Sequence, residues 1–190
     1  SFCYSFVQLA LSTFLGLLAF RLAGFTPVEA GLVLTVFHVS GIFGRPGWGA
    51  IADRLQGWGS MLPAIGLFTA GFTAVLVALA LAENLAPWLL YGLAAALGLC
   101  ASGWNGVFFV ELSNAVPAEA LGSVTGKALT ITFAGVVVGP SVIGLLLFTL
   151  HPAVALGSLV GIALIGSLLA WLGVVKSRRL GSSAVPGVRL

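Results

Sequence analysis

Two ionisable residues lie inside one long apolar stretch, where a positive charge would bind an anion. His38 and Arg45 are seven residues apart, so a helix would place both on one face. An ionisable group within a membrane span costs at least about 2.5–3.5 kcal/mol, and it faces a cavity or a partner. A desolvated guanidinium pairs well with a carboxylate. We therefore expect Arg45 to contact an anion; the alternatives are snorkelling to the membrane surface or structural pairing. His38 either shares this role or bonds to a neighbouring helix.

Uncharged polar residues recur at helical spacing on two further apolar stretches. They are Tyr4, Gln8 and Ser12 on the first, and Tyr91, Gly98, Ser102 and Asn105 on the second. Each set falls on one helical face. Hydrogen bonding between helices is one explanation, and lining of a substrate pathway is the other. The candidate substrate-binding residues are Gln8, His38, Arg45, Ser102 and Asn105.

A polar connector, GAIADRLQG, follows the stretch that holds His38 and Arg45. Asp53 can accept hydrogen bonds at the N-terminus of a neighbouring helix, where the helix dipole favours a negative charge. Arg54 can pair with Glu111 or Glu119. We expect a charge cluster that latches helices together in one conformation and opens in another. Its members are Gly49, Asp53, Arg54, Glu111 and Lys127.

The composition requires that membrane-spanning elements position these residues. Of the 190 residues, 59% are hydrophobic and 7% are charged, and the mean hydropathy is +1.16. A soluble domain has about 25% charged residues. Six continuous apolar stretches approach the ~20 residues with which a helix crosses the hydrocarbon core. They predict an all-α bundle of six transmembrane helices over residues 2–21, 30–52, 60–82, 86–110, 123–149 and 152–175. A basic tail follows over residues 176–190.

The basic residues predict the orientation of this bundle. Six spans place both chain ends on one side of the membrane. Seven of the eight Lys and Arg residues then lie on that side, namely Arg45, Arg54, Lys127, Lys176, Arg178, Arg179 and Arg189. Only Arg21 lies on the other side. The positive-inside rule therefore predicts that both ends are cytoplasmic.

The fifth stretch contains a string of small residues, GKALTITFAGVVVGPSVIG. Gly135 and Gly139 form a G-x-x-x-G pair, which allows two helices to approach closely. Pro140 removes a backbone hydrogen bond and kinks a helix. The predicted helix-packing residues are Gly126, Gly135, Gly139, Pro140 and Gly144. Cys3 and Cys100 sit in apolar segments as small hydrophobic residues, and we expect no metal and no cofactor.

Six helices, the Asp-Arg connector and the Gly-Pro string together resemble one half of a transporter of the major facilitator superfamily, which has twelve helices in two six-helix halves. The connector is similar to the family's G-x-x-x-D-R-x-G signature at Gly49, Asp53 and Arg54, with Gln56 in place of the second Gly. The string is similar to the family's G-x8-G-x3-G-P-x2-G-G pattern, with Ile143 in place of one Gly. The degenerate connector and the short basic tail favour the C-terminal half, although the string is usually strongest in the first half.

The segment GRPGWG resembles part of the monocarboxylate-type carriers, and the longer string around it resembles bacterial cyanate and organic-anion carriers. In the monocarboxylate type an Arg before Pro contacts the substrate carboxylate, and Arg45 is the matching position. An Asp often precedes that Arg by one turn, and here Gly41 stands at that position. The resemblance implies secondary transport of a small organic anion by alternating access across a bacterial inner membrane.

The expected partners are a small-molecule substrate, a coupling proton as an optional second substrate, the other six-helix half and membrane lipid, without nucleic acid. One alternative is a six-helix protein that acts as a homodimeric carrier or as a non-transporting subunit. A remote alternative is an intramembrane serine protease using Ser102 and His151. That pairing conflicts with geometry, because His151 lies at a span boundary and Ser102 lies deep inside its span. We expect the protein to have no enzymatic activity.

Overall fold

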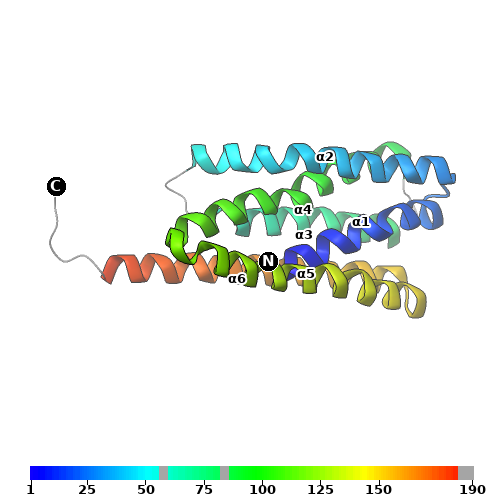
Figure 1. Ribbon diagram of the computed structural model, residues 1–190. Coiled ribbons are helices and arrows are strands. Elements are labelled where there is room, and N and C mark those ends of the chain that lie inside the picture. Colours follow the sequence, from blue (N-terminus) through cyan, green and yellow to red (C-terminus); the bar gives the residue numbers. More distant parts are fainter. Residues whose placement is uncertain (56–59, 82–85, 184–190) are drawn as a thin grey trace.

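The computed structural model describes residues 1–55, 60–81 and 86–183, and it is a bundle of six helices (Figure 1). All six have the length and apolar composition to cross a membrane. The all-α membrane fold predicted from composition is therefore confirmed. The helices are α1 (Phe2–Leu22), α2 (Pro27–Arg54), α3 (Leu62–Leu81), α4 (Pro87–Ala115), α5 (Ala118–Thr149) and α6 (Pro152–Ser183).

Local signals set where several of these helices begin. Thr26 and Glu29 form a capping box at α2, in which the Glu29 N–H donates to Thr26 Oγ1 at 3.3 Å and the Thr26 N–H donates to Glu29 Oε2 at 2.8 Å. A proline occupies the first position of α2, α4 and α6, where its missing N–H removes no helical hydrogen bond. Gly24 supplies a positive φ of 65° in the connection between α1 and α2.

Every helix except α3 extends at one or both ends beyond the apolar span from which it was predicted. α2 begins at Pro27 rather than at residue 30, and α4 and α5 nearly meet at Ala115 and Ala118. The predicted tail is helical up to Ser183, so the boundary at residue 176 marks the end of the apolar span but not of the helix. The physical reason is that backbone hydrogen bonding continues into the polar interface. Residues 184–190, Gln56 of the connector and residue 82 of the third predicted span lie outside the described residues.

α1 and α4 form the centre of the bundle. Over their membrane-length windows 56% of the residues are buried, against 28–33% for the other four helices. The most extensive helix pairs are α2 with α4, α3 with α6, and α1 with α5. Figure 1 shows α2 along one side of the bundle and α5 along the other, with α1 and α4 between them. Polar residues on α1, α2 and α4 can therefore face one another.

Glycines allow the closest of these approaches. A Cβ atom added to Gly139 would lie 2.5 Å from the Phe6 carbonyl oxygen, and one added to Gly135 would lie 2.5 Å from the Phe2 carbonyl oxygen. The predicted G-x-x-x-G pair thus lies directly against the α1 backbone. Gly144 faces the Phe14 ring, and α5 runs unbroken through Pro140. A Cβ atom on Gly126 would meet nothing within 4 Å, so the described helices offer no packing partner to that residue.

Candidate functional site

A hydrogen-bonded cluster joins α1 and α4 around the side chain of Gln8. Gln8 Oε1 accepts hydrogen bonds from Trp104 Nε1 at 2.9 Å and from Asn105 Nδ2 at 3.2 Å. Gln8 Nε2 donates to Ser102 Oγ at 3.5 Å. The structure therefore brings together three of the five candidate substrate-binding residues, which the sequence places on two separate helices. Gln8 and Asn105 are half-buried, and Ser102 and Trp104 are buried.

His38 bonds to the same helix as Gln8, one turn further along α1. Its Nε2 atom is 3.2 Å from Ser12 Oγ, so the third polar residue of the α1 stripe contacts α2. The imidazole is exposed. Tyr4, by contrast, donates its hydroxyl proton to the Leu62 carbonyl oxygen at 2.7 Å. Gln8 and Ser12 hence face α4 and α2, and Tyr4 has a structural bond to the start of α3.

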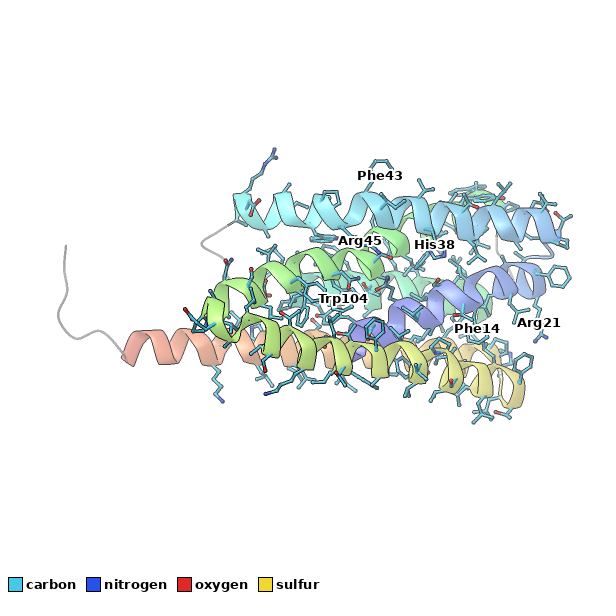
Figure 2. The ribbon with its side chains drawn as sticks, in the orientation of Figure 1. Phe14, Arg21, His38, Phe43, Arg45 and Trp104 are labelled. Atoms are coloured by element: carbon cyan, nitrogen blue, oxygen red, sulfur yellow. The ribbon has the colours of Figure 1, made fainter. Side chains whose placement is uncertain are left out.

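Arg45 occupies the same side of α2 as His38. Figure 2 shows both residues on the side of α2 toward the rest of the bundle, with Phe43 on the opposite side. The Arg45 side chain is exposed, and the described residues provide it with neither an ion pair nor a hydrogen bond. Its backbone lies close to α4, because the Arg45 carbonyl oxygen would lie 2.9 Å from a Cβ atom on Gly106. A helix packed on α4 thus presents a guanidinium whose five donors have no acceptor among the described residues.

Gly41 is the position at which the resemblance to monocarboxylate-type carriers leads one to look for an acid. A Cβ atom there would lie 2.8 Å from Ser102 Oγ and 2.9 Å from Ser102 Cβ. Both distances are shorter than real Cβ contacts. A side chain at this position would therefore require Ser102, or α2 relative to α4, to shift.

The predicted latch residues lie near one end of the bundle, and only some of them come together. Gly49, Asp53 and Glu111 line one open cavity of about 730 Å³. The hydrogen-bonding neighbours of the Glu111 carboxyl group are Ser60 and the Met61 backbone rather than Arg54. Arg54 and Lys127 are exposed, and neither forms an ion pair within the part of the chain that the structure describes. The pairing of Arg54 with an acid therefore stays a prediction.

The residues of the serine-protease alternative have other partners. Ser102 is buried against Gln8 and Gly41 in the middle of α4. His151 is exposed between α5 and α6, where its Nδ1 atom accepts a hydrogen bond from the Ala153 N–H at 3.3 Å. The described residues contain no group of three or more His, Cys, Asp or Glu that could hold a metal ion.

The sequence did not reveal the role of Trp104, nor that glycines of α2 and α4 pack directly against each other's helix. Trp104 is 1% exposed and stacks on Tyr4, with ring centroids 5.6 Å apart. Gly44 and Gly98 each lie against the backbone of the opposite helix. The spacing of three residues from Gly41 to Gly44 was a usable signal for close packing. The bond from Trp104 to Gln8 left no such signal, because it depends on how α1 and α4 meet.

These features define a multi-pass integral membrane protein with a polar cluster and an exposed cation on facing helices. Comparison with family models gives a match to the Major Facilitator Superfamily over residues 1–189. The chain belongs to this superfamily, and it is a membrane transporter with half of the superfamily fold. Transporters of this family bind small-molecule substrates. A comparison with curated proteins gives no match, and neither does a comparison with solved structures.

Proposed function

We propose that the chain is the C-terminal six-helix half of a secondary transporter that moves a small organic anion by alternating access. Substrate would bind near the midplane between two six-helix halves, and one half would rock against the other. α1 and α4 supply the polar cluster around Gln8, and α2 supplies His38 and Arg45. Both chain ends would be cytoplasmic, in the inner membrane of a bacterium. A coupling proton is an optional second substrate.

The observation that carries this proposal is the exposed Arg45 guanidinium on the side of α2 shared with His38. A cation within a span faces a cavity or a counter-charge, and the described residues supply no counter-charge. A substrate carboxylate would supply it and accept two parallel hydrogen bonds from the guanidinium. The predicted latch would act at the cytoplasmic end. Its members are Gly49, Asp53 and Arg54 of the connector, Glu111 of α4 and Lys127 of α5.

Uptake of labelled acetate, pyruvate and benzoate into proteoliposomes tests the role of Arg45. A hydrogen bond to a charged group contributes about 1.5–3 kcal/mol, so we expect Arg45→Ala to weaken anion affinity by roughly ten- to a hundredfold. Arg45→Lys keeps the charge and loses the fork geometry, so its effect should be intermediate. Unchanged affinity for every transported anion in Arg45→Ala would remove Arg45 from the site.

The number of helices in the working unit needs a separate test. Of the residues in the membrane-length windows of α2 and α5, 28% are buried within this chain, against 33% for α3 and α6. Both helices therefore have exposed surface on which a second bundle could pack. That bundle is the other six-helix half in our proposal, and a second copy of this chain in the alternative. A reading frame that continues about 200 residues upstream with six further spans would favour the first. A start codon immediately before Ser1, with a dimer in detergent, would favour the homodimeric carrier or a non-transporting subunit.

A further inference from the structure

We infer that Trp104 is a positioning residue that fixes which end of the Gln8 amide faces the substrate. An amide side chain can offer either its oxygen or its NH2 group, and the two orientations differ by a half-turn. The choice decides whether the site donates or accepts a hydrogen bond at this point. This inference rests on the proposed function, because it concerns the same anion site.

The indole N–H of Trp104 determines the orientation of the Gln8 amide, because the indole can only donate a hydrogen bond. Trp104 Nε1 lies 2.9 Å from the Gln8 amide, so the atom that faces it must be the acceptor Oε1. Asn105 Nδ2 donates to the same oxygen at 3.2 Å, and the two bonds use both of its lone pairs. Gln8 Nε2 then points to Ser102 Oγ, and its second N–H has no acceptor among the described residues. The half-buried Gln8 therefore has a spare donor and no spare acceptor.

Packing prevents Trp104 from releasing this arrangement. The indole is 1% exposed, stacks on Tyr4 and contacts the tilted ring of Phe108, with centroid separations of 5.6 Å in each case. Figure 2 shows Trp104 in the middle of the bundle. Tyr4 is itself held by its bond to the Leu62 carbonyl oxygen. The donor presented by Gln8 thus has the same polarity as the guanidinium of Arg45, and both match a ligand whose exposed atoms are acceptors, such as a carboxylate.

The experiment measures binding of benzoate and of benzamide, its neutral isostere, to the reconstituted transporter. Benzoate offers only acceptors, whereas benzamide carries an NH2 group that needs an acceptor from the site. The wild type should bind benzoate more tightly than benzamide. In Trp104→Phe an aromatic ring remains but the indole N–H is lost, so the Gln8 amide can rotate by a half-turn and exchange Oε1 with Nε2. We expect the benzoate-to-benzamide preference to fall about tenfold, which is the effect of one charge-assisted hydrogen bond.

The matched control is Trp48→Phe. Trp48 Nε1 also donates one hydrogen bond, to the Leu99 carbonyl oxygen at 3.1 Å, but it does not contact Gln8. This variant should keep the wild-type preference. If Trp104 were only a packing residue, Trp104→Phe would weaken both ligands by the same factor, and that result would overturn the inference. A wild type without a preference for benzoate would overturn it as well.

A second variant covers the case in which Trp104→Phe does not fold. Gln8→Glu keeps two acceptors for Trp104 and Asn105, but its ionised carboxylate presents no donor and repels an anion, so benzoate affinity should fall at least tenfold. Unchanged benzoate affinity would contradict the role of Gln8. Arg45→Ala in the same assay separates the two proposals. Loss of benzoate binding there, with an unchanged preference in Trp104→Phe, leaves the proposed function standing and refutes the positioning role.

Discussion

Replacement of Gly44 by alanine tests whether the contact between α2 and α4 holds this half together. A Cβ atom at Gly44 would collide with the Leu99 carbonyl oxygen, and it would lie 2.9 Å from Leu99 Cα and 3.0 Å from the carbonyl carbon. All three atoms belong to the backbone of α4. Rotation of a side chain cannot relieve the collision, so the two helices must separate.

The magnitude follows from a comparison with Gly47→Ala on the same helix. A Cβ atom at Gly47 would meet nothing within 4 Å. Both variants gain the same helix propensity, about 1 kcal/mol in water, and this term cancels between them. The difference is the overpacking penalty of about 1–3 kcal/mol, and collision with backbone places it in the upper part of that range. We expect Gly44→Ala to be less stable than Gly47→Ala by about 2–3 kcal/mol.

Reversible unfolding in mixed micelles, with SDS as the denaturant and helicity as the signal, measures this difference. Gly47→Ala should be as stable as the wild type or slightly more stable. Equal stability of the two alanine variants would refute the close α2–α4 contact. It would also contradict the explanation that close packing of α2 on α4 disfavours a side chain at position 41.

Two further predictions concern other helices. Gly139→Ala should destabilise the bundle by about 1–3 kcal/mol relative to Gly126→Ala, because only the first would collide with the α1 backbone; the same SDS titration measures it, and equal stabilities would contradict the α1–α5 contact. Thr26→Ala should cost about 1 kcal/mol, because it removes the side-chain half of the capping box with Glu29. Faster hydrogen exchange confined to the first turn of α2 would show this local loss, and unchanged exchange would contradict it.

The six helices were predictable because hydropathy directly reports the free energy of burying a segment in lipid. The residues at which each helix begins and ends were less predictable. The Thr26–Glu29 capping box advances the start of α2 to Pro27, and helical hydrogen bonding carries α6 to Ser183, past its apolar span. Neither effect depends on hydrophobicity, so an apolar window cannot locate it.

The site shows the same division between local pattern and tertiary contact. Helical spacing identified Gln8, Ser102 and Asn105 as polar residues on inward faces. It gave no means of pairing them, because the pairing depends on how far α1 is shifted along α4. The role of Trp104 could not be predicted for the same reason. In the sequence, a tryptophan that donates a hydrogen bond to another helix looks the same as one that only fills the core. The same holds for the Ser12–His38 contact between α1 and α2.

The empty position at Gly41 links packing to mechanism. An acid one turn before Arg45 would place a carboxylate beside the guanidinium, where it could carry a proton. A side chain there would collide with Ser102, which belongs to the cluster around Gln8. An acid at this position would therefore require Ser102, or α2 relative to α4, to shift. Within the described residues no carboxylate pairs with Arg45. In the proposed function that leaves the Arg45 charge for an anionic substrate, and the glycine at position 41 places no acid beside it.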